Sequence, residues 1–239
     1  MTMKRNLLLV AALSVIVASS IASANATTYN LANDWGTANP NGPWSFLQGT
    51  NLLPYQSSNV CCGINSPGYA PSINPGNFLP VFWQSAGLGS DIFIHSVDGG
   101  NGNPALGEAT LTWTAPVAGT IDVSGYLYYA QLGLQRGNSY VLSLGGSSLQ
   151  SGTLTYLNAS GPANEVPVSF NGLAVSSGEN LSLVLQSLGI GDGGGTMTGL
   201  NLIVTETAAA PGPVPGAGLA GLAAFLLLAG AAKLRGLSG

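Results

Sequence analysis

Positive charge is almost absent from the central part of this 239-residue sequence. Four of its five basic residues lie near the two ends: Lys4, Arg5, Lys233 and Arg235. Residues 27–213 keep only Arg136 against nine acidic residues, which gives this stretch a formal net charge of one minus nine, or −8. Such a surface cannot displace the counterions of a phosphate backbone or attract anionic lipid headgroups. We therefore expect no nucleic-acid partner.

Cysteine is nearly as scarce, and its placement excludes an internal disulfide framework. The two cysteines are adjacent, Cys61 and Cys62, so no third cysteine exists for a bridge elsewhere in the monomer. A vicinal disulfide, an intermolecular bridge and two free thiols all remain open, because adjacent cysteines are far from ordinary disulfide geometry. Neither Cys-x-x-Cys spacing nor a nearby histidine is present, which argues against a zinc site.

The sequence contains one histidine, His95. A single histidine cannot form a histidine-rich metal site. A relay with Asp91 or Asp98 is formally possible, but nothing resembles the nucleophile elbow that such a triad uses. We interpret His95 as a hydrogen-bonded structural residue.

Apolar residues between 27 and 210 repeat with a period of two, and no window there predicts an amphipathic helix. Alternation bounded by Gly, Pro, Asn and Ser is typical of strands with one buried face. The predicted strands are residues 28–31, 44–48, 79–83, 91–96, 109–115, 120–129, 139–144, 152–157, 166–170, 180–186 and 198–206. About ten short strands separated by turn signals predict an all-β fold, a β-sandwich of jelly-roll type. Residues 31–108 are richer in Gly, Pro and Asn, so we expect long connections there.

The N-terminus predicts a signal helix for export. Lys4 and Arg5 precede an apolar stretch over residues 7–21, and small residues follow it. Cleavage is expected after Ala24 or Ala26, which makes residues 1–26 a signal peptide. The alternative is an uncleaved N-terminal anchor.

The C-terminus predicts a second hydrophobic helix. An Ala/Pro/Gly linker (208–213) follows the β-sandwich domain (27–207), and the tail (214–239) combines Val214, Pro215 and Gly218 with an apolar run over 219–232. Lys233 and Arg235 then end the run, and the positive-inside rule places them in the cytoplasm. The run is at the lower limit of a spanning helix, so its insertion is marginal. Cleavage near Val214 would release the domain, whereas an uncut tail would be a permanent anchor.

The signal peptide, the central part and the tail together resemble PEP-CTERM sorting-domain proteins of Gram-negative bacteria. Val214 and Pro215 match the family motif, and Gly216 stands where the family has glutamate. The resemblance implies processing by a signal peptidase and by an exosortase-type membrane protease. It also implies transient anchoring in the inner membrane, followed by transfer to the cell surface or the extracellular space.

The central part resembles a β-sandwich that recurs beside such tails. The residues that carry this resemblance are 29–34, 39–46 (Asn-Pro-Asn-Gly-Pro-Trp-Ser-Phe), Ile94-His95 and 112–120, which include Trp-Thr-Ala-Pro. In the last segment we expect Trp113 to end a strand inside the core, and Gly119 to allow the reversal into the next strand. The resemblance implies a galactose-binding-like or jelly-roll fold, no established enzymatic activity and an association with extracellular polysaccharide.

One segment offers candidate metal ligands. Asp98, Asn101, Asn103 and Glu108 supply oxygen atoms in a glycine-rich stretch, and calcium takes six to eight oxygens from such loops. The ligand order of an EF-hand is not met, and a plain turn between strands is the alternative. The segment from Asp192 to Gly195 is interpreted as a turn.

Aromatic residues are the candidate sugar contacts, because flat rings contact the apolar faces of sugars while Asn and Gln bind their hydroxyls. Tyr126 and Tyr128 share one face of their strand and Tyr129 the other, so at least one should lie nearer the surface. The full set is Tyr29, Trp35, Trp44, Tyr55, Tyr69, Trp83, Tyr126, Tyr128 and Tyr129. Core packing is the competing interpretation.

These observations predict an exported surface or extracellular-matrix protein without enzymatic activity or cofactor. We expect a structural or adhesive role in an exopolysaccharide matrix, with a carbohydrate-binding module as the alternative. A glycan hydrolase is a third hypothesis. It would require two carboxyl groups facing each other across a cleft. An aromatic row on an exposed sheet face or loop rim would favour the carbohydrate-binding module.

Overall fold

Strands dominate the computed structural model, which describes residues 25–58, 60, 66–72, 79–84, 91–97, 108–131, 133–190 and 194–210. The strands are β1 (Ala26–Asn30), β2 (Trp44–Gln48), β3 (Asn51–Leu52), β4 (Tyr55–Gln56), β5 (Gly68–Tyr69), β6 (Val81–Gln84), β7 (Ile92–His95), β8 (Ala109–Thr114), β9 (Gly119–Tyr129), β10 (Gly137–Leu144), β11 (Ser147–Thr155), β12 (Val166–Val175), β13 (Asn180–Ser187) and β14 (Met197–Ala208). Within these residues, the 3₁₀ helix η2 (Pro162–Asn164) is the one helical element. The all-β prediction is confirmed for this part of the chain.

The predicted signal peptide and C-terminal helix lie outside the described residues, apart from Asn25 and from Ala26, which starts β1. In the residues that the structure describes, no helix has the length and apolar character needed to span a bilayer.

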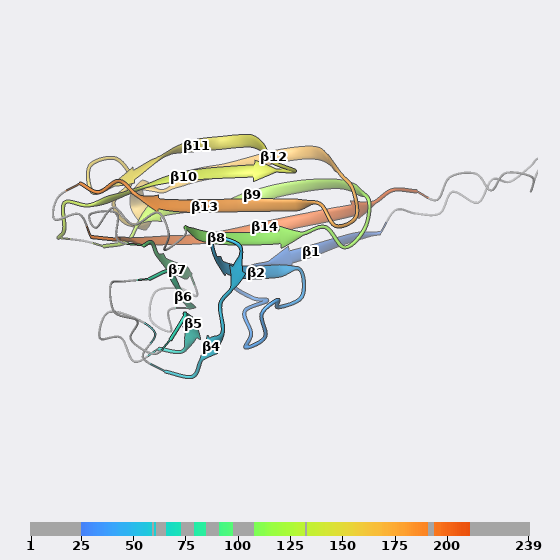
Figure 1. Cartoon of the computed structure of the whole chain (residues 1–239). Coiled ribbons are helices and arrows are strands. Elements are labelled where there is room, and N and C mark those ends of the chain that lie inside the picture. The colour runs from blue at the N-terminus through green and yellow to red at the C-terminus, as the bar shows by residue number, and fades with distance from the viewer. Residues whose placement is uncertain are drawn as a thin grey trace, which may run out of the picture. The chain divides into compact units, whose positions relative to one another are not determined.

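Two antiparallel sheets form the two layers of a sandwich (Figure 1). Sheet A has the order β12-β9-β14-β7-β6-β5-β4, and β1 also pairs with β14. The long strand β14 serves two neighbours on one side, because its residues 197–200 pair with β7 and its residues 203–207 with β1. Sheet B has the order β11-β10-β13-β8-β2-β3. Strands β7 to β14 therefore stack as β7-β14-β9-β12 over β8-β13-β10-β11, which is the strand order of a jelly roll.

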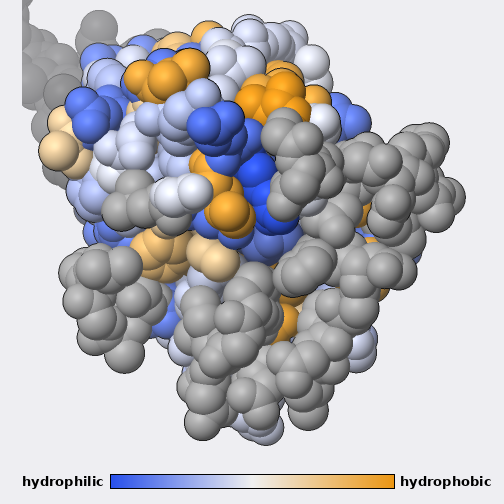
Figure 2. Space-filling model, turned by 90° about the vertical axis from the view of Figure 1, so that its left-hand side faces the viewer, coloured by the Kyte–Doolittle hydropathy of each residue, from blue (hydrophilic) through white to orange (hydrophobic). Residues whose placement is uncertain are grey.

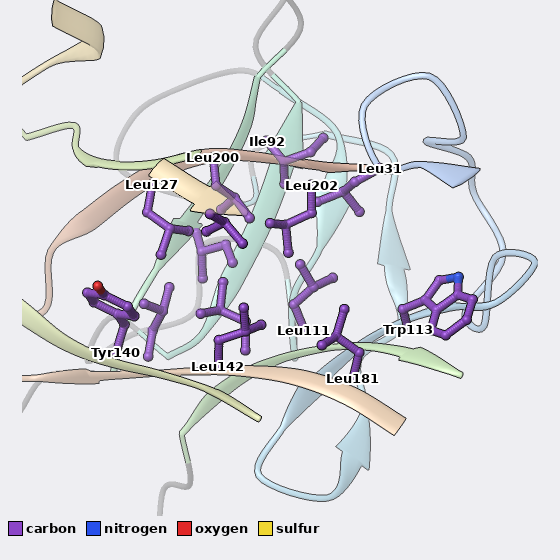
Figure 3. Packing of buried hydrophobic residues seen from close by; sticks show 14 of the residues in the cluster. Leu31, Ile92, Leu111, Trp113, Leu127, Tyr140, Leu142, Leu181, Leu200 and Leu202 are labelled. Atoms are coloured by element: carbon purple, nitrogen blue, oxygen red, sulfur yellow. The ribbon is translucent and has the colours of Figure 1, made fainter. Parts of the chain in front are cut away.

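Leucine-rich inner faces of the two sheets make the core (Figure 3). Leu127, Leu200 and Leu202 of sheet A point toward Leu111 and Leu142 of sheet B. The residues between them in sequence face outward, so the period of two in the sequence follows from one buried face per strand. Trp113 is fully buried in β8, and β8 ends one residue later. Its predicted place at the end of a core strand is confirmed.

The predicted strand over 152–157 is wrong at both ends. The observed β11 begins at Ser147, because Gly145 and Gly146, with φ values of 55° and 83°, form a two-residue hairpin turn after β10. It ends at Thr155, where the Asn158 side chain accepts a hydrogen bond from the Thr155 N–H (2.8 Å) and donates one to the Thr153 carbonyl (3.0 Å). Leu157 therefore lies in an exposed turn.

The Asn-Pro-Asn-Gly-Pro-Trp segment forms a corner that holds the first strands of sheet B. The Asn39 amide donates to the carbonyls of Phe46 (2.7 Å) and Leu53 (2.8 Å) and accepts from the Phe46 N–H (3.1 Å). The Asn41 side chain donates to the Asp34 carbonyl. The residues that carry the sequence resemblance here act by satisfying backbone groups between strands.

Candidate functional site

The outer face of sheet A carries a carboxylate shared by two tyrosines. The Tyr126 hydroxyl donates to Asp91 Oδ1 (2.5 Å), and the Tyr128 hydroxyl donates to Asp91 Oδ2 (2.8 Å). We call these three residues the carboxylate–tyrosine cluster. Asp91 and Tyr128 are buried, whereas Tyr126 is partly exposed. The cluster is therefore a buried polar anchor with one ring at the surface.

The strand period places the two tyrosines on this face. Tyr126 and Tyr128 alternate in β9 with Leu127 and Tyr129, which lie in the core. The prediction that the tyrosines split between the two faces, with one nearer the surface, is confirmed.

Both tyrosines reach across β14 to Asp91, which directly precedes β7. Gly199 of β14 makes this crossing possible for Tyr128, since a Cβ at Gly199 would lie 2.2 Å from the Tyr128 ring carbon Cζ. Any side chain at that position would push the ring off the sheet.

Burial and the Asp91 carboxylate both raise the pKa of Tyr126 and Tyr128 far above the ordinary tyrosine value. Desolvation is the largest cause, followed by the hydrogen bond to Asp91, because an ionised phenol could not donate to the carboxylate. The nearby charge of Glu165 adds to the effect. Both phenols therefore stay neutral near pH 7 and keep donating to Asp91.

An aromatic strip continues from the cluster along the same face. Trp83 stacks on Phe93 (ring centroids 5.5 Å apart), Phe93 meets Tyr128 edge to face (6.4 Å), and Tyr128 stacks on Tyr126 (6.3 Å). Trp83 and Phe93 are buried with Val60 and Ala70 in a second, smaller apolar cluster. An aromatic row thus exists on a sheet face, but only its Tyr126 end is open to solvent.

Asn201 completes the exposed end of the row. It lies directly opposite Tyr126 in the β14–β9 register and is partly exposed. Its Oδ1 accepts from the Ala32 N–H (3.3 Å), which fixes the amide so that its Nδ2 group is available as a donor. A flat ring beside a fixed amide can contact the apolar face of a sugar and bind its hydroxyls.

The nine aromatic residues predicted as sugar contacts fall into a buried group and a partly exposed group. Trp44, Tyr69, Trp83, Tyr128 and Tyr129 are buried, whereas Tyr29, Trp35, Tyr55 and Tyr126 are partly exposed. Core packing therefore applies to more than half of the set.

His95 is buried at the end of β7 on the outer side of sheet A, as its alternation with Ile94 requires. Burial, with a smaller contribution from Arg136, lowers its pKa from 6.5 to about 4, so the imidazole is neutral at pH 7. The Asp91 oxygens accept from tyrosine hydroxyls, as described above, and Asp98 lies outside the described residues. His95 is thus a buried, neutral side chain, and its structural role stays a prediction.

A buried polar network joins the sheets at the end where β7, β9, β11 and β13 finish. The Ser96 hydroxyl donates to Asn138 Oδ1 (2.7 Å), and the Asn138 amide donates to the Thr196 carbonyl (3.2 Å) and the Thr198 hydroxyl (2.9 Å). Arg136 donates to the Gly195 carbonyl (2.7 Å). The single basic residue of the domain therefore binds a backbone carbonyl of the segment before β14.

The surface at this end of the sandwich is mixed (Figure 2). Hydrophobic side chains interrupt a hydrophilic surface, and Leu134, Leu157 and Ile190 are the exposed apolar residues in the described turns there.

Of the four candidate calcium ligands, the structure describes only Glu108, so the calcium site stays a prediction. Glu108 is exposed, and its carbonyl accepts from the Gly49 N–H (2.7 Å), while Asp98, Asn101 and Asn103 lie outside the described residues. Among residues that are described, no group of three or more His, Cys, Asp or Glu side chains could hold a metal ion. Cys61, Cys62 and the sorting residues Ala24, Val214, Pro215, Gly218, Lys233 and Arg235 also lie outside.

No protein-family model and no curated protein matches this chain. The solved structures that match this chain include carbohydrate-binding modules and glycan-degrading enzymes. A CBM22 xylan-binding domain from Paenibacillus barcinonensis has 10% identity and a TM-score of 0.37, and the match covers 79% of this chain and 98% of that domain. A family 35 module from Clostridium thermocellum has 12% identity and a TM-score of 0.30 over 76% and 98% of the two chains. At such scores the likeness carries no argument about a ligand, and the β-sandwich assignment rests on the strand pairing itself.

Proposed function

We propose that this chain is an exported, non-catalytic protein of an extracellular polysaccharide matrix, and that it holds sugar chains at the outer face of sheet A. The observation that carries the proposal is the partly exposed ring of Tyr126, held by Asp91 and placed opposite Asn201. Ring and amide are fixed before any ligand arrives, which lowers the entropy cost of binding. The ligand class is an uncharged or weakly charged polysaccharide, since the domain repels polyanions.

The absence of catalysis is part of the same proposal. A glycan hydrolase uses one carboxyl as an acid and a second as a nucleophile or base. Asp91 is buried and accepts two tyrosine hydroxyls, so it is held as a structural anchor instead of facing a substrate. A buried neutral His95 is equally unsuited to proton transfer with a bound ligand.

A structural or adhesive role remains the broader description of the protein. Trp83 and Phe93, the covered part of the aromatic strip, stabilise the fold and are not ligand contacts in this proposal. On this description, sugar binding at Tyr126 is the contact that holds the domain within the matrix.

The last part of the proposal is that the N-terminal signal peptide and the C-terminal tail direct export of the protein. A signal peptidase and an exosortase-type protease are the expected partners, with the C-terminal helix as a transient inner-membrane anchor. Cleavage after Ala24 suits the fold better than cleavage after Ala26, because β1 begins at Ala26, which pairs with Thr207. Mass measurement of both mature termini tests this choice, and truncation after Pro213 is expected to change where the protein accumulates.

Binding is tested with the full chain on a panel of neutral and acidic polysaccharides. We expect Tyr126→Ala to weaken binding to a neutral glycan at least about fivefold, since a ring contact contributes on the order of 1 kcal/mol. Tyr126→Phe keeps the ring and should weaken binding less. Tyr156→Ala, a partly exposed tyrosine in the turn after β11, is the matched control and should bind like the wild type. Equal binding by Tyr126→Ala and the wild type would refute the site.

A further inference from the structure

Sheet B contains no charged residue in any of its six strands. None of the nine acidic residues lies in β2, β3, β8, β10, β11 or β13, and Arg136 lies outside these strands too. These strands lie side by side as one layer (Figure 1). For a domain with a formal net charge of −8, one whole layer is therefore neutral.

The outer face of sheet B is organised in rows that run across the strands. One row is mostly apolar: Ser151, Val141, Val184, Thr110, Leu47 and Leu52. The neighbouring row is made of hydroxyl side chains: Ser148, Ser143, Ser182, Thr112 and Ser45. Val141 and Leu52 are 40% and 48% exposed, so the apolar row is open to solvent.

Several hydroxyls of this face have partners within the sheet. Thr112 and Ser182 hydrogen-bond to each other (3.2 Å), and the Thr114 hydroxyl donates to Asn180 Oδ1 (2.8 Å). The Ser139 hydroxyl donates to the Gln186 carbonyl (3.3 Å). A dry interface can cover such groups without leaving buried donors unsatisfied. The face also presents no aromatic ring, which removes the platform on which a sugar would stack.

We infer that the outer face of sheet B is a self-association surface, on which a second copy of this chain stacks face to face about a two-fold axis. When two copies join here, no charged side chain from the strands of either copy's sheet B enters the interface. Association through these strands therefore avoids the free-energy cost of removing charged groups from water. Among the described acidic residues, Glu108 is exposed directly before β8 and lies at the rim of this face, where solvent and salt screen its charge.

The size of the face is adequate for a pair. Six strands spaced about 4.8 Å apart span about 24 Å, and eight-residue strands such as β10 and β13 extend about 27 Å. The face thus projects to roughly 600 Å², and side-chain relief adds to it, against the roughly 800 Å² per partner of a standard interface.

Two copies could also pair edge to edge, strand against strand. At the edge formed by β11 and β12, however, side chains already bind some of the backbone groups. Asn158 bonds to the Thr153 carbonyl and the Thr155 N–H on β11, and Gln150 donates to the Pro167 carbonyl of β12 (3.2 Å). These contacts cover backbone groups that a partner strand would need. The flat face is the better surface for association.

The test is the oligomeric state of the full chain, measured by sedimentation equilibrium in one mild detergent for all variants. Val184 lies near the middle of the apolar row, so Val184→Glu and Val184→Lys should each weaken the dimer at least about tenfold, because each places like charges against each other across the two-fold axis. An equimolar mixture of the two variants should restore dimers. Ile203→Glu is the matched control, since Ile203 is a partly exposed β-branched residue on the outer face of sheet A.

Each outcome of this test is decisive. Dimers that are weakened by either Val184 variant, restored by mixing and unaffected by Ile203→Glu support the surface. A monomeric wild-type chain, or dimers that Val184→Glu does not weaken, overturn it. Loss of polysaccharide binding by Val184→Glu in a monomeric wild-type background would instead assign this face to a glycan. Thermal unfolding of each variant verifies folding, and the Tyr126 experiment is independent of all these results.

Discussion

The buried imidazole of His95 predicts a specific loss of stability in mild acid. Its pKa is lowered from 6.5 to about 4, first by burial and then by Arg136. Because the folded pKa is the lower one, the unfolded chain binds the proton more readily between these values. The stability that the neutral imidazole contributes is therefore fully present above pH 6.5 and is lost as the pH falls toward 4.

The size of the loss follows from these two pKa values. Between pH 7.5 and pH 4.5, an unfolded group at 6.5 becomes almost fully protonated, while a folded group near 4 takes up only a fraction of a proton. Linkage then gives a loss of about 2.5 kcal/mol, or about 70-fold in the unfolding equilibrium. Other groups also contribute to the pH dependence of unfolding, so a single pH profile cannot isolate His95.

A non-titrating variant isolates the histidine. We expect His95→Gln to be less stable than the wild type at pH 7.5, but to lose about 2.5 kcal/mol less between pH 7.5 and 4.5. Urea unfolding followed by tryptophan fluorescence at both pH values gives the difference directly. Parallel pH profiles for the two proteins would show that His95 is accessible to protons in the fold and would refute the argument.

Two substitutions test the packing around the site and the core. Gly199→Ala should cost about 2 kcal/mol of stability, because its Cβ would meet the Tyr128 ring at 2.2 Å; the cost should fall when Tyr128 is also changed to Ala, as a double-mutant cycle in urea would show. Trp44→Phe should cost about 1 kcal/mol more than Trp113→Phe, because Trp44 Nε1 donates to Asp34 Oδ2 (3.2 Å) whereas the buried Trp113 Nε1 has no acceptor among the described residues. Equal losses for the two tryptophans would contradict this assignment.

Most strands of the sandwich were predictable, because a strand with one buried face leaves a period of two in the sequence. Residues 44–48 agree with β2 at both ends, and 120–129 differs from β9 by one residue. The start of β11 was missed although Gly145-Gly146 is a hairpin signal. Its end was missed because Asn158 terminates the strand through its side chain, which periodicity does not detect.

The short strands β3, β4 and β5 were not predicted, since two residues cannot display a period. Each is held by a neighbour: Tyr69 of β5, for example, pairs with both Tyr55 and Phe82. Their existence depends on contacts between segments.

The candidate site was predicted only in part. The split of Tyr126 and Tyr128 from Tyr129 follows from alternation within one strand. Asp91 and Asn201 were not connected with it, because they join the tyrosines only where β7, β14 and β9 lie side by side.

By itself, the sequence determined the class of fold, the inward and outward sides of the long strands and the near absence of positive charge, because each is a local or compositional property. Only the tertiary structure decided which strands are neighbours. That arrangement placed two tyrosines on one buried carboxylate and gathered six uncharged strands into a single sheet. The physical reason is that strand pairing joins residues far apart in sequence, through backbone hydrogen bonds that are the same for every side chain.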